Sequence, residues 1–571
     1  MEKENIISFR VRTNDIPTKP YNDQKPGTSG LRKKVKVFLQ ENYLNNFVQC
    51  IFSAHQPEEY KGKTLIVGGD GRYYNDVAID LIIRIALGNG VKKILVPKSG
   101  VFSTPCVSVL IRKTPNCFGG IILSASHNPG GINEDFGIKF NSSNGAPSNE
   151  GITKRIYDLS LEIKSFQSIT GLEEENFFGR ELRFNINNEE GYEVNIVDTT
   201  KDYVELMREE FDFDLIEKLF NKKGFLFVFD AMHGASGPYA QEIFGNIFKV
   251  NKENLLNCDV LPDFGGHHPD PNLVYAKELV SLLNIKKDSK KDVVQFGAAC
   301  DGDADRNMIL GWECFVSPSD SLAIIAANSF RIKAYNKNKE RALHGVARSM
   351  PTSSAVDRVA KKLGIQCYEV PTGWKFFGNL MDDNRINLCG EESFGTSSNH
   401  IREKDGLWAV LCWLSILADY NKNHDELKVT IKDIVEEHWK TYGRDYYCRY
   451  DYEELPTEIA EKITKQLEDN FESFSKESEH NKAYIFEYKD PVDGSISKNQ
   501  GWIFSLGESR IIFRKSGTSS TGATIRIYFE KYSQDSIGLE VGEGIKDLVE
   551  KALKLSKINE ISSRTGPSVI T

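Results

Sequence analysis

The sequence predicts an α/β protein with three similar mixed α/β domains, followed by a smaller C-terminal α+β domain. Apolar runs of strand length alternate with helix-periodic segments, and this alternation restarts twice. After about residue 436, long polar helices and two antiparallel-type strands replace it. Strand–helix–strand alternation favours a mostly parallel, doubly wound sheet. We place the domains at residues 1–202, 203–315, 316–435 and 436–571.

The first domain opens with about 30 polar, turn-rich residues that end in the loop Lys25–Arg32. The region 142–195, rich in Asn, Ser and Glu, is interpreted as an insertion with a helix and a connector. Between them, the expected strands are Thr64–Gly69, Lys93–Pro97, Gly119–Leu123 and Asp135–Asn141, and the expected helices are Val77–Leu87 and one from about Pro105.

The later domains repeat and then abandon this alternation. The second domain has the strands Phe225–Asp230 and Phe296–Cys300, with a helix near Pro238. The expected elements of the third are helices from Ser319, over Thr352–Leu363 and over Trp374–Met381, strands His344–Ala347, Gln366–Val370 and Ile386–Cys389, and an amphipathic helix Asp405–Tyr420. The last domain should contain helices over 456–474 and 536–556 and two antiparallel strands, Ser509–Lys515 and Thr524–Glu530.

Composition places few constraints on function but excludes some classes. The chain has 571 residues, 40% hydrophobic and 27% charged, and a net charge of −9, which argues against a nucleic-acid or anionic-membrane surface. The ten cysteines form no CxxC pair, so we expect reduced thiols. The N-terminus lacks a signal-peptide pattern, and the longest apolar run, Leu407–Ala418, is shorter than the roughly 20 residues that span a bilayer. We therefore expect a cytoplasmic protein.

Residues 119–131 read Gly-Gly-Ile-Ile-Leu-Ser-Ala-Ser-His-Asn-Pro-Gly-Gly, an apolar strand that breaks into polar and turn-forming residues. Hydroxyl and imidazole groups therefore follow the carboxyl end of a strand, where α/β proteins place ligands. An ordinary polar turn is the alternative. Adjacent side chains on a tight turn rarely face each other well, so His127 is a poor candidate for the base of a hydrolytic Ser126. We expect His127 to shape its loop.

Residues 300–307 read Cys-Asp-Gly-Asp-Ala-Asp-Arg-Asn and directly follow another apolar strand. Asp301, Asp303 and Asp305 supply hard oxygen ligands at alternate positions, which suits Mg²⁺. An EF-hand loop would need Gly where Arg306 stands, and a phosphatase Asp pair usually has Thr or Val at the position of Asp305. A metal-binding loop fits best, with a solvated acidic turn as the alternative.

Two loops of the third domain carry ligand-type groups. The loop Gly390–Gly395 contains Glu391 and Ser393, a carboxylate and a hydroxyl that can form paired hydrogen bonds to sugar hydroxyls. The junction Pro371–Trp374 joins a strand to a helix, whose free N–H groups can bind polar ligand atoms. A solvated loop and simple N-capping are the alternatives.

A fourth cluster, Arg514–Ser520, lies at the end of a strand and offers forked and backbone donors to a phosphate. On the next strand, Arg526 lies on the face opposite Ile525 and Ile527 and can aim at the same anion. A solvated turn is again the alternative. Taken together, the clusters suit phosphoryl transfer on a sugar phosphate.

In the order and spacing of these motifs, the chain resembles the phosphoglucomutases of the α-D-phosphohexomutase superfamily, in their eukaryotic cytosolic form. The resemblance runs from Lys25–Arg32 to Gly522–Arg526. The signature Pro371–Asp382 is similar to that of glucose-type mutases rather than phosphomannomutases. Within the family, the chain is most similar to the protist branch that includes parafusin. Ser124 stands where the family often has Thr.

The resemblance implies four domains around a central cleft, each presenting one cluster. It implies that Ser126 carries the phosphoryl group and that Mg²⁺ bridges it to Asp301, Asp303 and Asp305. Arg32 and Lys139 would lie beside the serine, and Lys139 would move protons on the sugar hydroxyl if its pKa were lowered. The implied substrate-binding residues are Arg306, Thr372, Gly373, Glu391, Ser393 and Lys404, with Arg514, Ser516, Gly517, Thr518 and Arg526 holding the phosphate that does not react.

The implied activity is interconversion of glucose 1-phosphate and glucose 6-phosphate through a phosphoserine enzyme. Glucose 1,6-bisphosphate would be the intermediate and activator. The alternatives are a bisphosphate synthase or phosphopentomutase relative, or a parafusin-like role in secretion in addition to catalysis. As partners we expect small hexose phosphates, no nucleic acid and no membrane anchor, and as the oligomeric state a monomer, with a dimer as the alternative.

Overall fold

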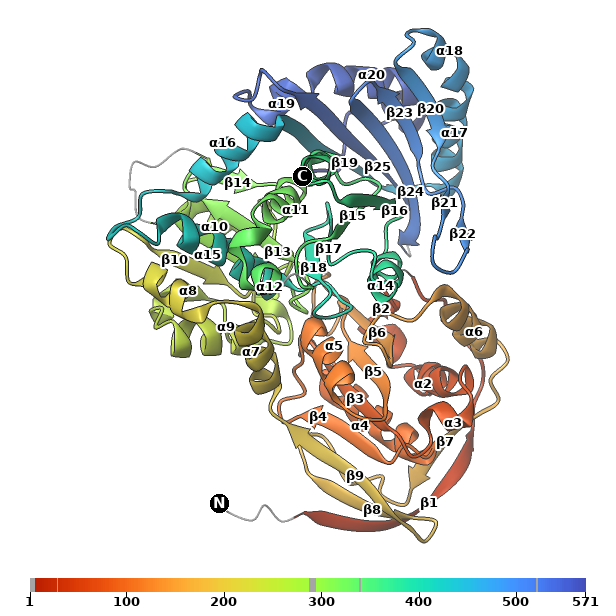
Figure 1. The fold of residues 1–571 in the computed structure, drawn as a ribbon. Coiled ribbons are helices and arrows are strands. Elements are labelled where there is room, and N and C mark those ends of the chain that lie inside the picture. Colours follow the sequence, from red (N-terminus) through yellow and green to blue (C-terminus); the bar gives the residue numbers. More distant parts are fainter. Residues whose placement is uncertain (1–5, 28, 287–293, 338–339, 520–521) are drawn as a thin grey trace. The chain divides into compact units, whose positions relative to one another are not determined.

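The computed structural model describes residues 6–27, 29–286, 294–337, 340–519 and 522–571, except for the side chains of 517–519. Figure 1 follows the helices and strands along the chain. They form two compact units, each described by itself. The first unit contains Met1–Cys314, Arg331–Ala342 and Phe394–Lys428, and the second contains Phe315–Phe330, Leu343–Ser393 and Val429–Thr571.

The N-terminal part of the first unit is a nine-stranded sheet in the order β2-β6-β5-β3-β4-β9-β8-β1-β7. Its strands are β1 (Ile7–Pro17), β2 (Leu31–Lys34), β3 (Thr64–Gly69), β4 (Lys93–Pro97), β5 (Cys117–Leu123), β6 (Asp135–Ser142), β7 (Ser165–Thr170), β8 (Leu182–Ile186) and β9 (Glu189–Val197). β3 pairs in parallel with β4 and β5, whereas β6 pairs antiparallel with both β5 and β2. The sheet is therefore mixed, and less parallel than the strand–helix alternation predicts.

Five strands of this sheet, β1, β2, β7, β8 and β9, were not expected from the sequence. β1 lies in the segment expected to be turn-rich, and β7, β8 and β9 lie in the segment expected to be a helix and connector, of which only α6 (Glu150–Ser160) is the helix. Most residues of β1 are exposed or half-buried, so it has no apolar run. Its pairing partners are far away in sequence, as in Arg12 opposite Thr170 and Ile7 opposite Leu182.

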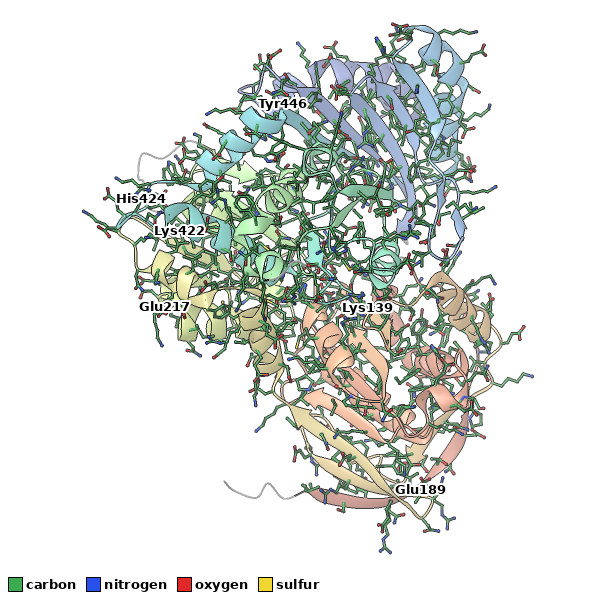
Figure 2. The ribbon with its side chains drawn as sticks, viewed as in Figure 1. Lys139, Glu189, Glu217, Lys422, His424 and Tyr446 are labelled. Carbon is green, nitrogen blue, oxygen red and sulfur yellow. The ribbon has the colours of Figure 1, made fainter. Side chains whose placement is uncertain are left out.

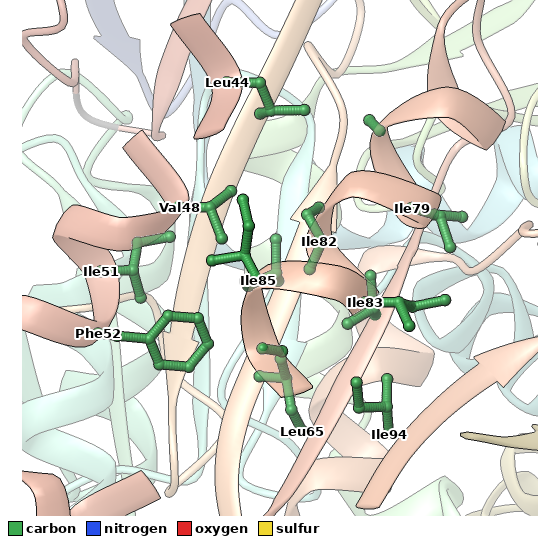
Figure 3. Packing of buried hydrophobic residues seen from close by; sticks show 14 of the residues in the cluster. Leu44, Val48, Ile51, Phe52, Leu65, Ile79, Ile82, Ile83, Ile85 and Ile94 are labelled. Atoms are coloured by element: carbon green, nitrogen blue, oxygen red, sulfur yellow. The ribbon is translucent and has the colours of Figure 1, made fainter. Parts of the chain in front are cut away.

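Helices α2 (Tyr43–Ser53) and α4 (Asn75–Gly88) pack on one face of this sheet, and α5 (Thr104–Lys113) packs on the other. The contact with α5 is close, because a Cβ on Gly120 would lie 2.7 Å from Val107. Figure 3 shows the core on the first face, with Leu44, Val48, Ile51 and Phe52 from α2, Ile79, Ile82, Ile83 and Ile85 from α4, and Leu65 and Ile94 from the strands. This core fixes the strands whose carboxyl ends carry the serine loop.

The rest of the first unit holds the acidic loop. β12 (Phe296–Cys300) is parallel to β10 (Phe227–Asp230) and antiparallel to β13 (Asn307–Gly311), and β11 (Leu255–Leu256) pairs with β10. The helix α15 (Gly406–Asn421) contacts α8 (Phe213–Phe220) and also β13. Every residue of α15 from Gly406 to Ala418 is buried, so the expectation of an amphipathic helix was wrong. A helix that is apolar on all sides packs against neighbours on all sides.

The second unit combines a parallel sheet with an antiparallel one. β15 (Gly345–Ser349) pairs in parallel with β16 (Gln366–Val370) and β17 (Leu388–Glu391), beside α11 (Pro318–Ala327), α13 (Ala355–Leu363) and α14 (Trp374–Asp382). The second sheet has the order β20-β23-β24-β25-β19-β26. Its strands are β19 (Arg444–Leu455), β20 (Asn481–Ile485), β23 (Trp502–Leu506), β24 (Ser509–Ser519), β25 (Gly522–Ser533) and β26 (Val569–Ile570).

One face of this antiparallel sheet is apolar and packs on α17 (Thr457–Asp469) and α20 (Lys546–Ser556). The other face carries charged residues such as Arg514 and Arg526 together with Ile503, Ile512 and Tyr528, which belong to a second apolar cluster. The remaining longer helices are α7 (Thr199–Glu210) in the first unit and α16 (Ile431–Tyr442) in the second. All ten cysteines are free thiols, and eight are buried. Among the described residues, no helix has the length and apolar character needed to cross a membrane.

Candidate active site

Ser126 lies in a strained loop just after the carboxyl end of β5. It adopts a left-handed backbone conformation (φ 53°), which costs a non-glycine residue about 1 kcal/mol, and it is buried. Ser124 holds the loop from within, since its Oγ accepts a hydrogen bond from Ser126 N (2.7 Å). The same Oγ donates to Asp70 Oδ2 (2.6 Å) on the loop after β3. The hydroxyl of Ser124 thus links the reactive loop to a buried carboxylate.

Arg72 clamps the serine loop from below. Its guanidinium is fully buried and donates from Nη2 to the Ser126 carbonyl (2.9 Å) and from Nη1 to the Asp135 carbonyl (2.9 Å). Its Nε donates to Asp70 Oδ2 (2.9 Å). Burial raises the pKa of Asp70, although Arg72 and the Ser124 hydrogen bond favour its charged form. We expect this ion pair to hold the strained conformation of Ser126.

Sequence analysis did not identify Asp70 and Arg72. The signal was available, because Asp70-Gly71-Arg72 directly follows β3, the strand next to the one that carries the serine. The carboxyl ends of adjacent parallel strands meet at one edge of a sheet. A charged turn after β3 could therefore have been placed beside Ser126 from the sequence.

The acidic loop brings together three buried carboxylates. One oxygen from each of Asp301, Asp303 and Asp305 lies within 4.8 Å of the others. Asp301 Oδ1 accepts hydrogen bonds from the backbone N–H groups of Asp305 (2.9 Å) and Arg306 (3.0 Å), and Ala304 turns the loop with a positive φ of 63°. Asp301 Oδ2 accepts from Ser126 Oγ (2.8 Å), so the acidic loop and the serine loop are in direct contact.

This donor set fits a small divalent cation. Within the described residues, Asp303 Oδ1 and Asp305 Oδ1 are buried and lack a hydrogen-bond partner. Burial raises the pKa of Asp301, and the neighbouring carboxylates Asp305 and Asp303 raise it further. Burial opposes ionisation of Asp303 too, but Lys139, a hydrogen bond from Thr104 and the charge of Lys404 lower its pKa. Three close carboxylates with two unused oxygens can hold a hard cation such as Mg²⁺.

Two lysines face these carboxylates. Figure 2 labels Lys139, which belongs to β6. Its Nζ lies 3.2 Å from Asp303 Oδ2. Lys404 has its Nζ 3.2 Å from Asp305 Oδ2. Burial acts to lower the pKa of Lys139, but Asp303, Glu403 and Asp305 outweigh it and raise the pKa. The sequence-based condition for a basic Lys139, a lowered pKa, is therefore not met in this arrangement, and the lysine is a cation.

The loop that carries Lys404 is anchored by its neighbours. Asn141 donates to Glu403 Oε1 (2.9 Å), and Tyr203 donates to Asp405 Oδ1 (2.5 Å). Asp405 also contacts His400 Nε2 (3.0 Å) and caps the first turn of α15. Burial raises the pKa of Glu403 to about 7, with Lys139 acting in the opposite direction. Hydrogen bonds to its neighbours Glu403 and Asp405 therefore fix the position of Lys404 beside the acidic loop.

The remaining sequence-predicted residues of the first unit also lie near the serine and acidic loops. His127 Nδ1 is 3.4 Å from Ser126 Oγ, a long contact for a base and its nucleophile. Arg306 Nη1 lies 3.4 Å from Asp270 Oδ1. Arg32, on β2, is half-buried, and loss of solvent around it lowers its pKa while Asp303 raises it. Thr28, in the loop before Arg32, lies outside the described residues.

In the second unit, the predicted sugar-binding groups end one strand and begin one helix. Glu391 is the last residue of β17 and is buried, and Ser393 follows it, half-buried. The loop is fixed at Glu392, whose N–H donates to Thr352 Oγ1 (2.9 Å). Gly373 precedes α14 with a positive φ of 132°, and the buried Thr372 Oγ1 has no hydrogen-bond partner among the described residues.

Three of the predicted phosphate-binding residues, Arg514, Ser516 and Arg526, share one sheet face. Arg514 on β24 lies directly opposite Arg526 on β25, and Ser516 lies opposite Thr524. Gly517 and Thr518 belong to β24, but their side-chain environment lies outside the described residues. Sequence analysis did not identify Asp451 on β19, which lies opposite Arg526 with its Oδ2 3.6 Å from Arg526 Nε. Because β19 was not predicted, no pattern pointed to it.

Comparison with protein-family models identifies four successive matches. Models of the phosphoglucomutase/phosphomannomutase family match residues 23–167 (α/β/α domain I), 201–311 (domain II) and 318–442 (domain III). A model of the phosphoglucomutase-1 C-terminal domain matches residues 444–568. These matches together cover most of the chain.

Individual relatives agree with the family models. Phosphoglucomutase-1 of Paramecium tetraurelia is 53% identical over 97% of this chain and 98% of its own length. The cytoplasmic phosphoglucomutase of Mesembryanthemum crystallinum is 51% identical over 99% of this chain and all of its own. The open-form crystal structure of the Paramecium exocytosis-sensitive phosphoprotein pp63/parafusin, a phosphoglucomutase, is 52% identical and superposes with a TM-score of 0.92 over 100% of both chains. The chain belongs to the phosphoglucomutase family of the α-D-phosphohexomutase superfamily.

Proposed function

We propose that this protein is a phosphoglucomutase that interconverts glucose 1-phosphate and glucose 6-phosphate, with Ser126 as the phosphoryl carrier. The observation that carries the proposal is the contact between Ser126 Oγ and Asp301 Oδ2 at 2.8 Å. It puts a clamped hydroxyl beside three carboxylates whose donor set suits a divalent cation. The relatives at about half identity are phosphoglucomutases by name, which supports the same substrates.

The proposed reaction begins with phosphorylated Ser126. The P–Oγ bond breaks as a bond forms to O6 of glucose 1-phosphate, giving glucose 1,6-bisphosphate. The O1 phosphoryl group then returns to Ser126, and glucose 6-phosphate leaves. Asp301, Asp303, Asp305 and the Ser126 oxygen would hold Mg²⁺. When bound, this ion supplies electrostatic stabilisation of the charge on the phosphoryl oxygens.

The protons balance within this scheme. Ser126 Oγ gains one proton as it leaves phosphorus, and the sugar hydroxyl loses one. We assign the exchange to Lys139 because of its position, with Nζ 3.2 Å from Asp303 Oδ2 in the acidic loop that contacts Ser126. The protonated amine gives a proton to Oγ, and the neutral amine that results accepts the one from O6. Arg32 and Lys404 add positive charge where the phosphoryl group carries negative charge.

The second unit supplies recognition in this proposal. Glu391 and Ser393 bind sugar hydroxyls. Thr372 and Gly373 also contribute to substrate binding. Arg514, Ser516, Gly517, Thr518 and Arg526 hold the phosphate that does not react. A bisphosphate synthase and a phosphopentomutase remain the competing activities, and no specific observation favours either. The cytoplasm is the proposed compartment, since relatives carry that word in their names.

A coupled assay tests the proposal directly. The purified chain is given glucose 1-phosphate, Mg²⁺ and a trace of glucose 1,6-bisphosphate, and formation of glucose 6-phosphate is followed through a dehydrogenase. We expect turnover with glucose 1-phosphate to exceed that with ribose 1-phosphate, and intact mass to show one extra phosphate that is absent from Ser126→Ala. Preference for the pentose, or one-way accumulation of bisphosphate, would contradict the assignment.

A further inference from the structure

One face of the antiparallel sheet in the second unit carries two arginines side by side. Arg514 on β24 and Arg526 on β25 are directly opposite each other in the register. Opposite residues of antiparallel strands project from the same face, so the two cationic side chains are cross-strand neighbours. Like charges in this position destabilise a sheet, and an anion bound between them removes the repulsion.

The two arginines have different partners. Asp451, on β19, lies 3.6 Å from Arg526 Nε through Oδ2 and 3.0 Å from Arg449 Nε through Oδ1. Arg526 therefore shares a carboxylate with a second arginine. Arg514 instead donates from Nη1 to the hydroxyl oxygen of Tyr528 (3.2 Å), and within the described part of the chain it forms no ion pair with a carboxylate.

Tyr528 is well suited to hold a guanidinium without neutralising it. Its ring is buried in an apolar cluster with Ile512 and Met350, which fixes its position. Burial raises the pKa of its hydroxyl, with Arg514 acting in the opposite direction, so the phenol is neutral. A neutral oxygen accepts one N–H of Arg514 without neutralising the guanidinium, whereas a carboxylate in the same place would compete with a bound anion. Burial acts to lower the pKa of Arg514, whereas the carboxylates of Glu392 and Glu391 act on it through charge alone and raise it.

We propose that Tyr528 is a positioning residue for phosphate binding, which orients Arg514 while Asp451 partly neutralises Arg526. This inference rests on the proposed mutase function for its substrate, a hexose phosphate. Arg514 is then the principal ligand of the phosphate that does not react. Tyr528 acts through Arg514 and does not itself touch the sugar.

The test compares two conservative variants on the same sheet. Tyr528→Phe removes only the hydroxyl that contacts Arg514 and keeps the ring in its cluster. Tyr447→Phe is the matched control, because the Tyr447 hydroxyl donates to the Pro351 carbonyl (2.8 Å) instead. KM and kcat are measured for glucose 1-phosphate, and the affinity for inorganic phosphate is measured by calorimetry on each full-length protein.

We expect Tyr528→Phe to raise KM and to weaken inorganic phosphate binding by about tenfold, with kcat changed less than about twofold. Tyr447→Phe should stay within about twofold of wild type in both. Unchanged KM and phosphate affinity in Tyr528→Phe, or equal losses in both variants, would overturn the proposal. If the wild-type protein had no mutase activity, the proposed function would fail, but the phosphate affinities would still decide the role of Tyr528.

Discussion

Arg72 beneath the serine loop and Arg526 in the phosphate cluster differ in burial and in bonding. Arg72 is 0% exposed in its side chain and donates to a carboxylate and to three backbone carbonyls. Arg526 is 35% exposed, and its described ion pair with Asp451 is 3.6 Å long. The guanidinium of Arg72 is therefore shielded from solvent, whereas that of Arg526 remains partly accessible to it.

The difference follows from what each region has to hold. In the proposed reaction the serine oxygen takes part in bond making and breaking, and small displacements of a reacting atom cost rate. A buried network with fixed partners meets that requirement. The phosphate cluster has to accept phosphate attached to either end of a hexose, in the proposed reaction. Half-exposed arginines on an open sheet face, oriented by Tyr528 and Asp451, suit a ligand that changes its attachment.

The largest expected effect is the loss of turnover when Ser126 is replaced. Ser126→Ala should reduce mutase turnover by on the order of 10³-fold or more, because it removes the phosphoryl carrier. The coupled assay measures turnover, and intact mass measures phosphorylation. Ser143→Ala is the control, because Ser143 is exposed. Turnover within tenfold of wild type in Ser126→Ala would place the carrier elsewhere.

Removal of divalent metal should reduce turnover almost as strongly as Ser126→Ala does. It should leave phosphate binding at the phosphate cluster (Arg514, Ser516 and Arg526) almost unchanged. A chelator should abolish turnover, and added Mg²⁺ should restore it, because the three buried carboxylates otherwise repel one another. Asp303→Asn should raise the Mg²⁺ concentration needed, with exposed Asp535→Asn as control. Inorganic phosphate affinity should be unchanged by the chelator. Full turnover in chelator would contradict a metal role for the acidic loop.

Stability should separate the two arginines. Arg72→Ala should lower the free energy of unfolding by about 3–5 kcal/mol, because it leaves the buried Asp70 carboxylate unpaired. Arg526→Ala should cost less than about 1 kcal/mol, since its ion pair is screened by solvent. Urea unfolding followed by circular dichroism measures both. Arg72→Lys, which keeps the charge but loses the fork, should fold and show a lower kcat. Similar stability losses for Arg72→Ala and Arg526→Ala would remove the contrast.

A smaller effect concerns pH and Glu403. Its folded-state pKa of about 7 lies above the ordinary value of 4.5, so the folded protein binds this proton more tightly than the unfolded chain. The resulting stabilisation is complete below the unfolded pKa and is lost as pH rises through the folded pKa, between about 4.5 and 7. Glu403→Gln should flatten the decline in unfolding temperature across this window. The exposed Glu205→Gln should match wild type, and an equally steep decline in Glu403→Gln would show that Glu403 is ionised throughout.

Local patterns predicted the elements whose apolar residues are close together in sequence. The strands Thr64–Gly69 and Lys93–Pro97 have the predicted bounds, because short apolar runs between turns specify buried strands. β1 and β19 were missed, because β1 has a single buried residue, β19 shows no regular alternation of buried and exposed residues, and the pairing partners of both are distant in sequence. The position of helix α15 was predicted, but its burial on all sides was not. Its burial on every side depends on α8 and β13, which its own sequence does not reveal.

The sequence by itself determined which residue types stand at the strand ends: the serine after β5, the three carboxylates after β12 and the arginine pair on β24 and β25. Only the tertiary structure decided what holds them. The clamp from Asp70 and Arg72, the contact of Ser126 with Asp301, and the phenol of Tyr528 on Arg514 join residues from different elements. Side-chain chemistry is local to the sequence, but hydrogen bonds and charge compensation depend on distance in space, which only the folded chain sets.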